Sequence, residues 1–60
     1  MQLELSDEQV EVLRDALDSV VGDLSPEIAD TDNPTYRRQL VARRDLLRAI
    51  LSQVGGPLPR

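Results

Sequence analysis

The chain has 60 residues, a net charge of −4 and seven Arg, with no Lys, His or Cys and with Tyr36 as its one aromatic residue. This length fits a single small domain, and the missing Cys and His exclude a disulfide framework and an ordinary zinc site. Without Lys, His or Cys, the side chains available for acid–base or nucleophilic chemistry are carboxylates, hydroxyls and one phenol. The composition therefore predicts a protein that is not an enzyme and that uses no metal and no cofactor.

The size of the chain also bears on its partners. Domains this short usually need disulfides, a bound metal or oligomerisation, and the composition supports the third of these. We expect a homo-oligomer, in the first place a dimer, or else a complex with another protein. The first residues lack the basic start and apolar run of a signal peptide, and no stretch approaches the roughly 18 apolar residues of a membrane span. Because a chain without Cys fits a reducing compartment, we expect a cytoplasmic protein without membrane contact.

Residues 1–5 are expected to form an extended N-terminal segment, followed by a first helix over about 7–29. Ser6 and Gln9 have the spacing of a capping box at the start of this helix. The apolar residues that follow recur at steps of three and four, which places them on one helix face. They are Val10, Leu13, Leu17, Val20, Val21, Leu24 and Ile28.

Two residues, Gly22 and Pro26, interrupt this pattern. A proline removes one helical hydrogen bond, and its ring crowds the carbonyl four residues earlier. Two interpretations are open: the helix ends near Leu24 and restarts at once, or it continues through Pro26 with a kink near 22–26. The apolar stripe stays in phase up to Ile28, which favours the continuous, kinked helix.

Residues 30–33 have the composition of a turn, and a second helix is expected over about 34–54. Asn33 suits an N-cap, and Pro34 suits the first position of a helix. Two consecutive glycines predict the end of this helix, followed by a flexible tail over 55–60. The expected turn and cap residues are Asp30, Asp32, Asn33, Pro34 and Tyr36.

The acidic turn invites comparison with a calcium-binding loop, in which oxygen ligands recur at fixed positions. Pro34, Tyr36 and Val41 stand where such a loop needs its later ligands. The Asp and Asn side chains are better explained by turn geometry and capping, so no metal site is expected here.

Two helices joined by about four residues make an antiparallel helical hairpin, so the expected fold class is all-α. Apolar residues extend further round each helix than one neighbouring helix can cover. We therefore expect two hairpins to dimerise into a four-helix bundle. The expected core and interface residues are Leu13, Leu17, Val20, Val21, Leu24, Leu40, Leu47, Ile50, Leu51 and Val54.

Charge is divided unequally between the two helices. Residues 7–29 carry seven acidic residues and one Arg, whereas residues 34–54 carry five Arg and one Asp. Ion pairing between the helices, within one chain or between subunits, is the plain explanation. The alternative is nucleic-acid binding through the second helix, which is disfavoured because the whole chain is acidic and one Tyr offers no stacking platform.

Arg43 falls inside the apolar stripe of the second helix, between the angular positions of Tyr36 and Ile50. A buried guanidinium needs a carboxylate partner. Asp18 lies at a matching level of the first helix, so the sequence predicts an Arg43–Asp18 charge pair, with Asp15 as second choice. The alternative is that Arg43 extends into water while its stem covers neighbouring Leu side chains.

The segment from Glu27 to Arg37 reads E-I-A-D-T-D-N-P-T-Y-R. It resembles the core motif E-I-A-D-T-D-N-x-x-[YF]-R of a family of small uncharacterised bacterial proteins. The resemblance covers most of the chain from Ser6 to Leu51, although only the eleven-residue core is specific. Pro26 departs from the pattern, which has a helix former there. The resemblance implies a helical hairpin with an important turn, and it implies no activity.

These observations predict a non-catalytic module for protein–protein interaction or self-association. Two alternatives stay open. One is a small acidic inhibitor, comparable to an antitoxin, that docks a helix on a larger protein. The other is an accessory dimer that binds nucleic acid through its Arg-rich second helix.

Overall fold

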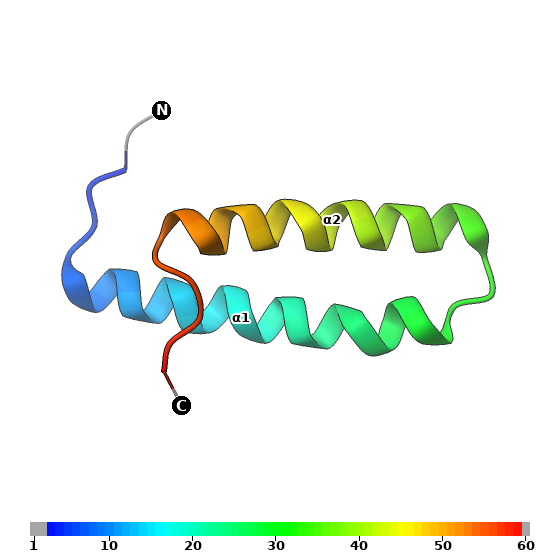
Figure 1. Ribbon diagram of the computed structural model, residues 1–60, viewed down its shortest axis with the longest axis horizontal. Coiled ribbons are helices and arrows are strands. Elements are labelled where there is room, and N and C mark those ends of the chain that lie inside the picture. Colours follow the sequence, from blue (N-terminus) through cyan, green and yellow to red (C-terminus); the bar gives the residue numbers. More distant parts are fainter. Residues whose placement is uncertain (1–2, 60) are drawn as a thin grey trace.

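The computed structural model describes residues 3–59. Helix α1 spans Asp7–Asp30, helix α2 spans Pro34–Gln53, and the two run antiparallel, side by side (Figure 1). Because the described residues contain two packed helices and no strand, the all-α hairpin is confirmed. The molecule measures 41 × 29 × 12 Å along its principal axes, so the two helices form a single layer.

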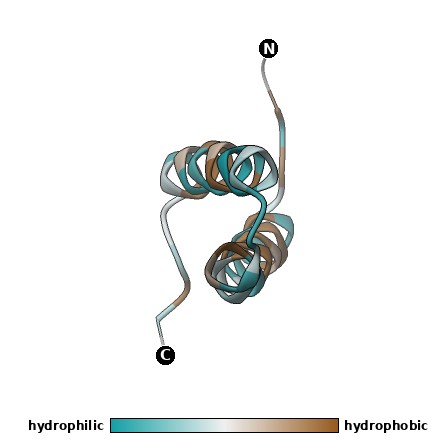
Figure 2. Ribbon diagram, turned by 90° about the vertical axis from the view of Figure 1, so that its right-hand side faces the viewer, coloured by the Kyte–Doolittle hydropathy of each residue, from teal (hydrophilic) through white to brown (hydrophobic). Residues whose placement is uncertain are grey.

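The segments outside the two helices leave this layer on opposite sides (Figure 2). Residues 3–5, which precede α1, have no regular secondary structure. Residues 1 and 2 of the expected N-terminal segment lie outside the described residues, as does Arg60. The layer therefore has two distinct faces, one beside the segment before α1 and the other beside the segment after α2.

The start of α1 follows from the capping box that the sequence predicts, which is confirmed. The backbone N–H of Gln9 donates to Ser6 Oγ at 3.1 Å, and the backbone N–H of Ser6 donates to Gln9 Oε1 at 2.9 Å. Asp7 and Glu8 follow in the first turn, where the positive end of the helix dipole favours anions. Local chemistry alone thus accounts for this helix end.

Pro26 lies inside α1, and the helix is unbroken across it. Pro26 has no N–H, so the carbonyl of Gly22 receives no hydrogen bond from it. Both residues are exposed, so water can satisfy that carbonyl on the outer side of the helix. The interpretation with two shorter helices is therefore wrong, and α1 continues to Asp30.

Asn33 caps the N-terminus of α2. Its Oδ1 accepts hydrogen bonds from the backbone N–H of Thr35 at 3.0 Å and of Tyr36 at 3.1 Å. Pro34 occupies the first position of the helix, where no N–H is needed. The predicted cap is confirmed, and the connection between the helices comprises residues 31–33.

The end of α2 is a two-glycine turn of the Schellman type. The N–H of Gly56 donates to the carbonyl of Leu51 at 2.8 Å, and the N–H of Gly55 donates to the carbonyl of Ser52 at 3.3 Å. Gly55 has φ +111°, a conformation that side chains with a Cβ rarely adopt. The helix therefore ends at the predicted glycines, with Val54 as its C-cap.

The core between the helices is thin. The buried hydrophobic residues are Leu17 and Leu24 on α1 and Leu40 and Leu51 on α2. The half-buried members of the expected core are Leu13, Val21, Leu47 and Val54. Val20 and Ile50 are 41% and 44% exposed. No side chain of the described part is fully enclosed, so one hairpin leaves much of its apolar surface in water.

Candidate interaction surface

One face of the layer has a hollow to which both helices contribute. The residues that line it are Leu24 and Glu27 of α1 and Tyr36, Gln39, Leu40 and Arg43 of α2. Seven residues make nearly two helical turns, so positions seven apart lie on the same side of a helix. Val20 therefore lies on the same side of α1 as Glu27, and Ile50 lies on the same side of α2 as Arg43.

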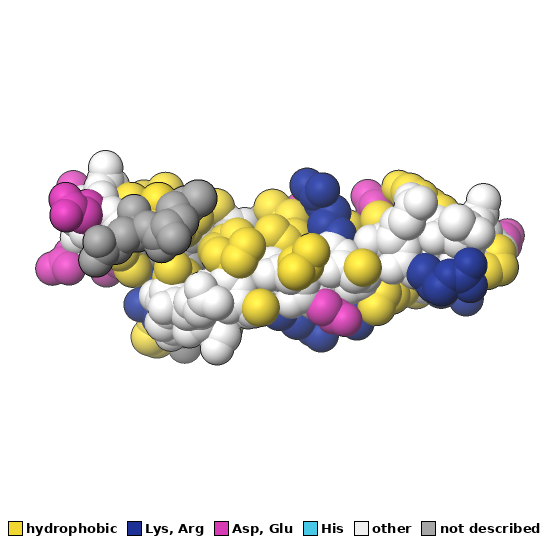
Figure 3. All heavy atoms as spheres, turned by 90° about the horizontal axis from the view of Figure 1, so that it is seen from above, with side chains coloured by type: hydrophobic (Ala, Val, Ile, Leu, Met, Phe, Trp, Pro, Cys, Tyr) yellow, Lys and Arg dark blue, Asp and Glu magenta, His cyan; other side chains and the backbone are white. Residues whose placement is uncertain are grey.

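We call this side of the layer the apolar face. Its exposed apolar members are Val12, Ala16 and Val20 on α1 and Tyr36, Leu46 and Ile50 on α2. The members on α1 are spaced by four residues, as are Leu46 and Ile50, and this spacing aligns them along each helix. Figure 3 views the layer edge-on, onto α2, and shows hydrophobic side chains along the middle of this edge, with charged side chains on either side of them.

Two large apolar side chains on this face are mostly exposed. Val12 and Leu46 are each 69% exposed, although each lies within a well-formed helix. Single exposed hydrophobic residues are common on protein surfaces, whereas a contiguous apolar patch marks a contact site. The apolar face brings six exposed apolar side chains from both helices to one side of the layer, so it is the candidate contact site.

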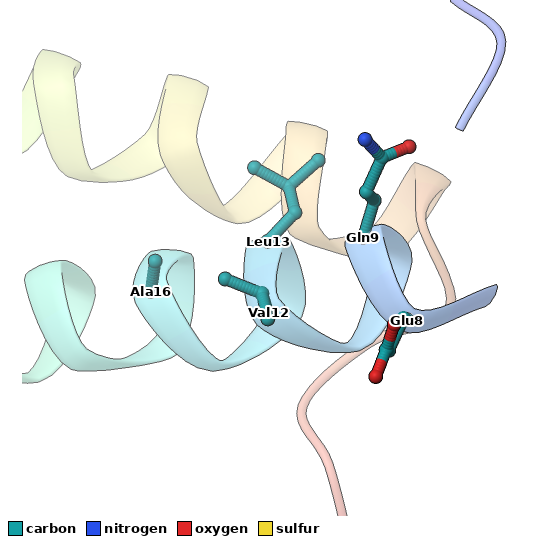
Figure 4. Close-up of a pocket in the computed structure, with 5 residues that line it drawn as sticks. All are labelled: Glu8, Gln9, Val12, Leu13 and Ala16. Atoms are coloured by element: carbon teal, nitrogen blue, oxygen red, sulfur yellow. The ribbon is translucent and has the colours of Figure 1, made fainter. Parts of the chain in front are cut away.

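A second hollow of about 450 Å³ lies on the N-terminal half of α1. Val12, Leu13 and Ala16 form its apolar lining, and Glu8 and Gln9 border it (Figure 4). Leu13 is half-buried, whereas the other two apolar side chains are exposed. This end of the apolar face therefore offers an open hydrophobic surface rather than an enclosed pocket.

The opposite face of the layer is occupied by the chain segment after α2, which crosses α1 in Figure 1. Arg14 holds this segment: its Nε donates to the carbonyl of Gly56 at 2.7 Å, and its Nη2 donates to the carbonyls of Gly55 and Pro57, each at 3.2 Å. One guanidinium thus satisfies three carbonyls beyond the helix end. The flexibility expected of residues 55–60 stays a prediction.

Arg37 makes a related contact at the other end of the hairpin. Its Nε donates to the carbonyl of Ile28 at 3.2 Å, and its Nη2 donates to the carbonyl of Thr31. Its neighbour Arg38 points its Nη2 at Thr35 Oγ1, 3.4 Å away. Arg37 therefore donates hydrogen bonds to backbone carbonyls at the end of α1.

The structure places the two members of the predicted charge pair in different hollows. Arg43 is exposed and lines the hollow of the apolar face together with Glu27. Asp18 is half-buried and lines a hollow beside the segment after α2, together with Arg48. The pairing of Arg43 with Asp18 stays a prediction, and Arg43 itself projects to the surface.

An ion pair within α2 joins Arg44 Nη2 to Asp45 Oδ1 at 3.3 Å. These residues are neighbours in sequence, and the carboxylate side chain is 60% exposed. Exposed pairs of this kind add at most about 1 kcal/mol to stability. The charges of the hairpin therefore contribute little through this contact, in contrast to the Arg contacts with helix ends.

The contacts of Arg14 were not predicted from the sequence, although a signal for them exists. Arg14 is the one basic residue in the otherwise acidic α1, and neither helix has a basic residue in its last turn. Helix C-termini favour cations, so each helix end lacked an obvious partner. An isolated Arg on the opposite helix is the remaining candidate for a cation at such a helix end.

Within residues 3–59, no cluster of three or more acidic, His or Cys side chains is placed to bind a metal ion, and neither helix is long and apolar enough to cross a membrane. No family model matches the chain, and no curated protein and no solved structure matches it. The resemblance to a family of bacterial helical hairpins therefore stays a prediction.

Proposed function

We propose that the protein is a non-catalytic self-association module, in which the apolar faces of two copies pack together into a four-helix bundle. The observation that carries this proposal is the exposure of the apolar face: Val12 and Leu46 are each 69% exposed, while only four leucines of the described chain are buried. Domains usually consist of two packed layers around one core. The hairpin is one such layer, and a second copy supplies the other.

The energetics favour a partner for this face. Full burial of one Val or Leu side chain returns about 1.5–3 kcal/mol. Two copies that meet through the apolar face bury the exposed residues of both, among them Val12, Val20, Leu46 and Ile50. This gain is large relative to the total stability of roughly 5–15 kcal/mol that is typical of a folded domain.

The proposal is tested by molar mass in solution, measured by light scattering after size exclusion over a wide range of concentrations. We expect a helical dimer, or a monomer–dimer equilibrium that shifts with concentration. A helical monomer at every concentration, up to the millimolar range, contradicts the proposal. In that case the apolar face serves a different protein, as expected of the acidic inhibitor.

A matched pair of variants locates the interface. Ala16 and Ala29 are both exposed residues of α1, and they lie about 140° apart around the helix. We expect Ala16→Glu to shift the protein to monomer, because the new carboxylate would be buried in the dimer without a partner. Ala29→Glu, away from the apolar face, leaves the molar mass unchanged. Equal effects of the two substitutions contradict an interface at this face.

A further inference from the structure

The two ends of the apolar face differ in chemistry. At the end near the start of α1, the face carries Val12, Ala16 and Ile50. Toward the turn, Glu27 and Arg43 border the hollow that Leu24, Tyr36 and Leu40 line. Charged residues of both signs, Glu27 and Arg43, thus border the part of the face toward the turn, whereas Glu8 is the one charged residue that borders the hollow near the start of α1.

This difference discriminates between the two ways in which identical faces can meet about a twofold axis. If the turns of the two copies lie at the same end, apolar surface covers apolar surface and the charged ends meet. If the turns lie at opposite ends, Glu27 and Arg43 of each copy are placed over the region of Val12 and Ile50 of the other. Burying charged groups against apolar side chains is unfavourable, so the first arrangement is preferred.

The charges of the helices support the same arrangement independently. α1 carries eight acidic residues and one Arg, a net charge of −7, whereas α2 carries five Arg and one Asp, a net charge of +4. With the turns at the same end, the twofold axis runs along the helices and places α1 of each copy against α2 of the other. With the turns at opposite ends, α1 faces α1 and α2 faces α2, so like charges meet.

We infer that the partner of the apolar face is a second copy of this chain whose turn lies at the same end, with Glu27 of each copy facing Arg43 of the other. This inference rests on the proposed self-association and adds its orientation. Both residues are exposed in the hairpin and border one hollow, so their side chains reach a shared level of the apolar face, between the positions of the two residues along the helices. A twofold axis along the helices preserves that level, and each dimer therefore contains two such pairs.

Charge reversal tests the pairing. We expect Glu27→Arg and Arg43→Glu each to weaken homodimerisation by roughly tenfold or more, because each places two pairs of like charges in the interface. Mixing the two variants restores association as a heterodimer, in which both contacts join opposite charges. The matched control is Arg48→Glu, the same substitution at an exposed residue that borders the hollow of the opposite face; it leaves dimerisation unchanged. A mixture that forms no more heterodimer than chance overturns the Glu27–Arg43 pairing.

A distance measurement tests the orientation separately. The chain has no Cys, so Asp32→Cys in the exposed turn gives a single site for a nitroxide label. We expect the two labels of the dimer to lie clearly closer than the 41 Å length of the molecule. A label separation near that length, in a protein that is dimeric by light scattering, overturns the orientation and leaves self-association intact. A monomer by light scattering overturns both proposals.

Discussion

Arg14 and Arg37 each cap the helix to which they do not belong. Arg14 of α1 donates to the carbonyls of residues 55–57 beyond the end of α2, and Arg37 of α2 donates to the carbonyls of Ile28 and Thr31 at the end of α1. Because neither helix has a basic residue in its own last turn, the opposite helix supplies the cation that each C-terminus favours. The two helices are therefore held together by arginine hydrogen bonds at both ends of the hairpin and by the buried leucines between them.

Removing the guanidinium of Arg14 should lower the stability of the hairpin. We expect Arg14→Gln to reduce the free energy of unfolding by about 1–2 kcal/mol, because three carbonyls lose a charged donor. Arg14→Lys should be intermediate, since an ammonium keeps the charge but cannot reproduce the fork of donors. Thermal unfolding followed by circular dichroism, at one fixed protein concentration, measures the change. A Gln variant as stable as the parent protein contradicts the role of Arg14.

Two adjacent arginines near the start of α2 serve as test and control. Arg37 donates to two carbonyls at the end of α1, whereas Arg38 contacts a single hydroxyl, Thr35 Oγ1, at 3.4 Å. We expect Arg37→Gln to destabilise the protein by about 1 kcal/mol, and Arg38→Gln to change its stability by less than about 0.5 kcal/mol. Urea unfolding of the two variants distinguishes these values. Equal losses mean that the net charge at this end of the hairpin matters rather than the hydrogen bonds of Arg37 to the end of α1.

Substitution by alanine should change the stability of the protein in opposite directions at two of its glycines. Gly55 has φ +111° at the end of α2, so Gly55→Ala introduces backbone strain of about 1 kcal/mol or more. Gly22 lies within α1, and a Cβ built there meets nothing within 4 Å, so Gly22→Ala should stabilise the protein by about 0.5–1 kcal/mol. Thermal unfolding midpoints of the two variants provide the comparison. A destabilising Gly22→Ala would indicate that the helix around Pro26 needs the freedom of glycine.

Substitution of two leucines of α2 distinguishes the contribution of the core from that of the proposed interface. Leu40 is 6% exposed and Leu46 is 69% exposed. We expect Leu40→Ala to destabilise the hairpin by about 2–5 kcal/mol, as truncation in a core does. Leu46→Ala should leave the helical content unchanged but weaken the dimer by about 1–2 kcal/mol, since its side chain is buried only on association. Sedimentation equilibrium together with circular dichroism measures both effects. A Leu46 variant that dimerises as the parent does places the interface elsewhere.

The parts of the fold that depend on local chemistry were predictable from the sequence. Ser6 and Gln9 form their capping box within one turn, and Asn33 caps α2 through the two N–H groups nearest to it. The glycines after α2 likewise act through bonds that span three to five residues. Such signals need no knowledge of tertiary structure, which is why the helix boundaries could be predicted to within one or two residues.

The contacts across the hairpin were harder to predict because they depend on the rotation of each helix. Arg43 lies in the apolar stripe of α2 by its angle, yet it is exposed, because the neighbouring helix covers only part of that stripe. Arg14 was not recognised as a cap, since its partners are 41–43 residues away in sequence. Helical periodicity shows which residues share a face but not which part of that face a neighbour covers.

The two arginine contacts also imply an order of folding. Arg37 joins residues six and nine positions apart, whereas Arg14 joins residues 41–43 positions apart. Closing a short loop costs less chain entropy than closing a long one, so contacts near the turn form first and the helices zip together toward the chain ends. We therefore expect the contact of Arg14 to form last during folding and to open first during unfolding. Arg14 therefore holds the chain ends of the hairpin together, at the place where we expect local fraying to begin.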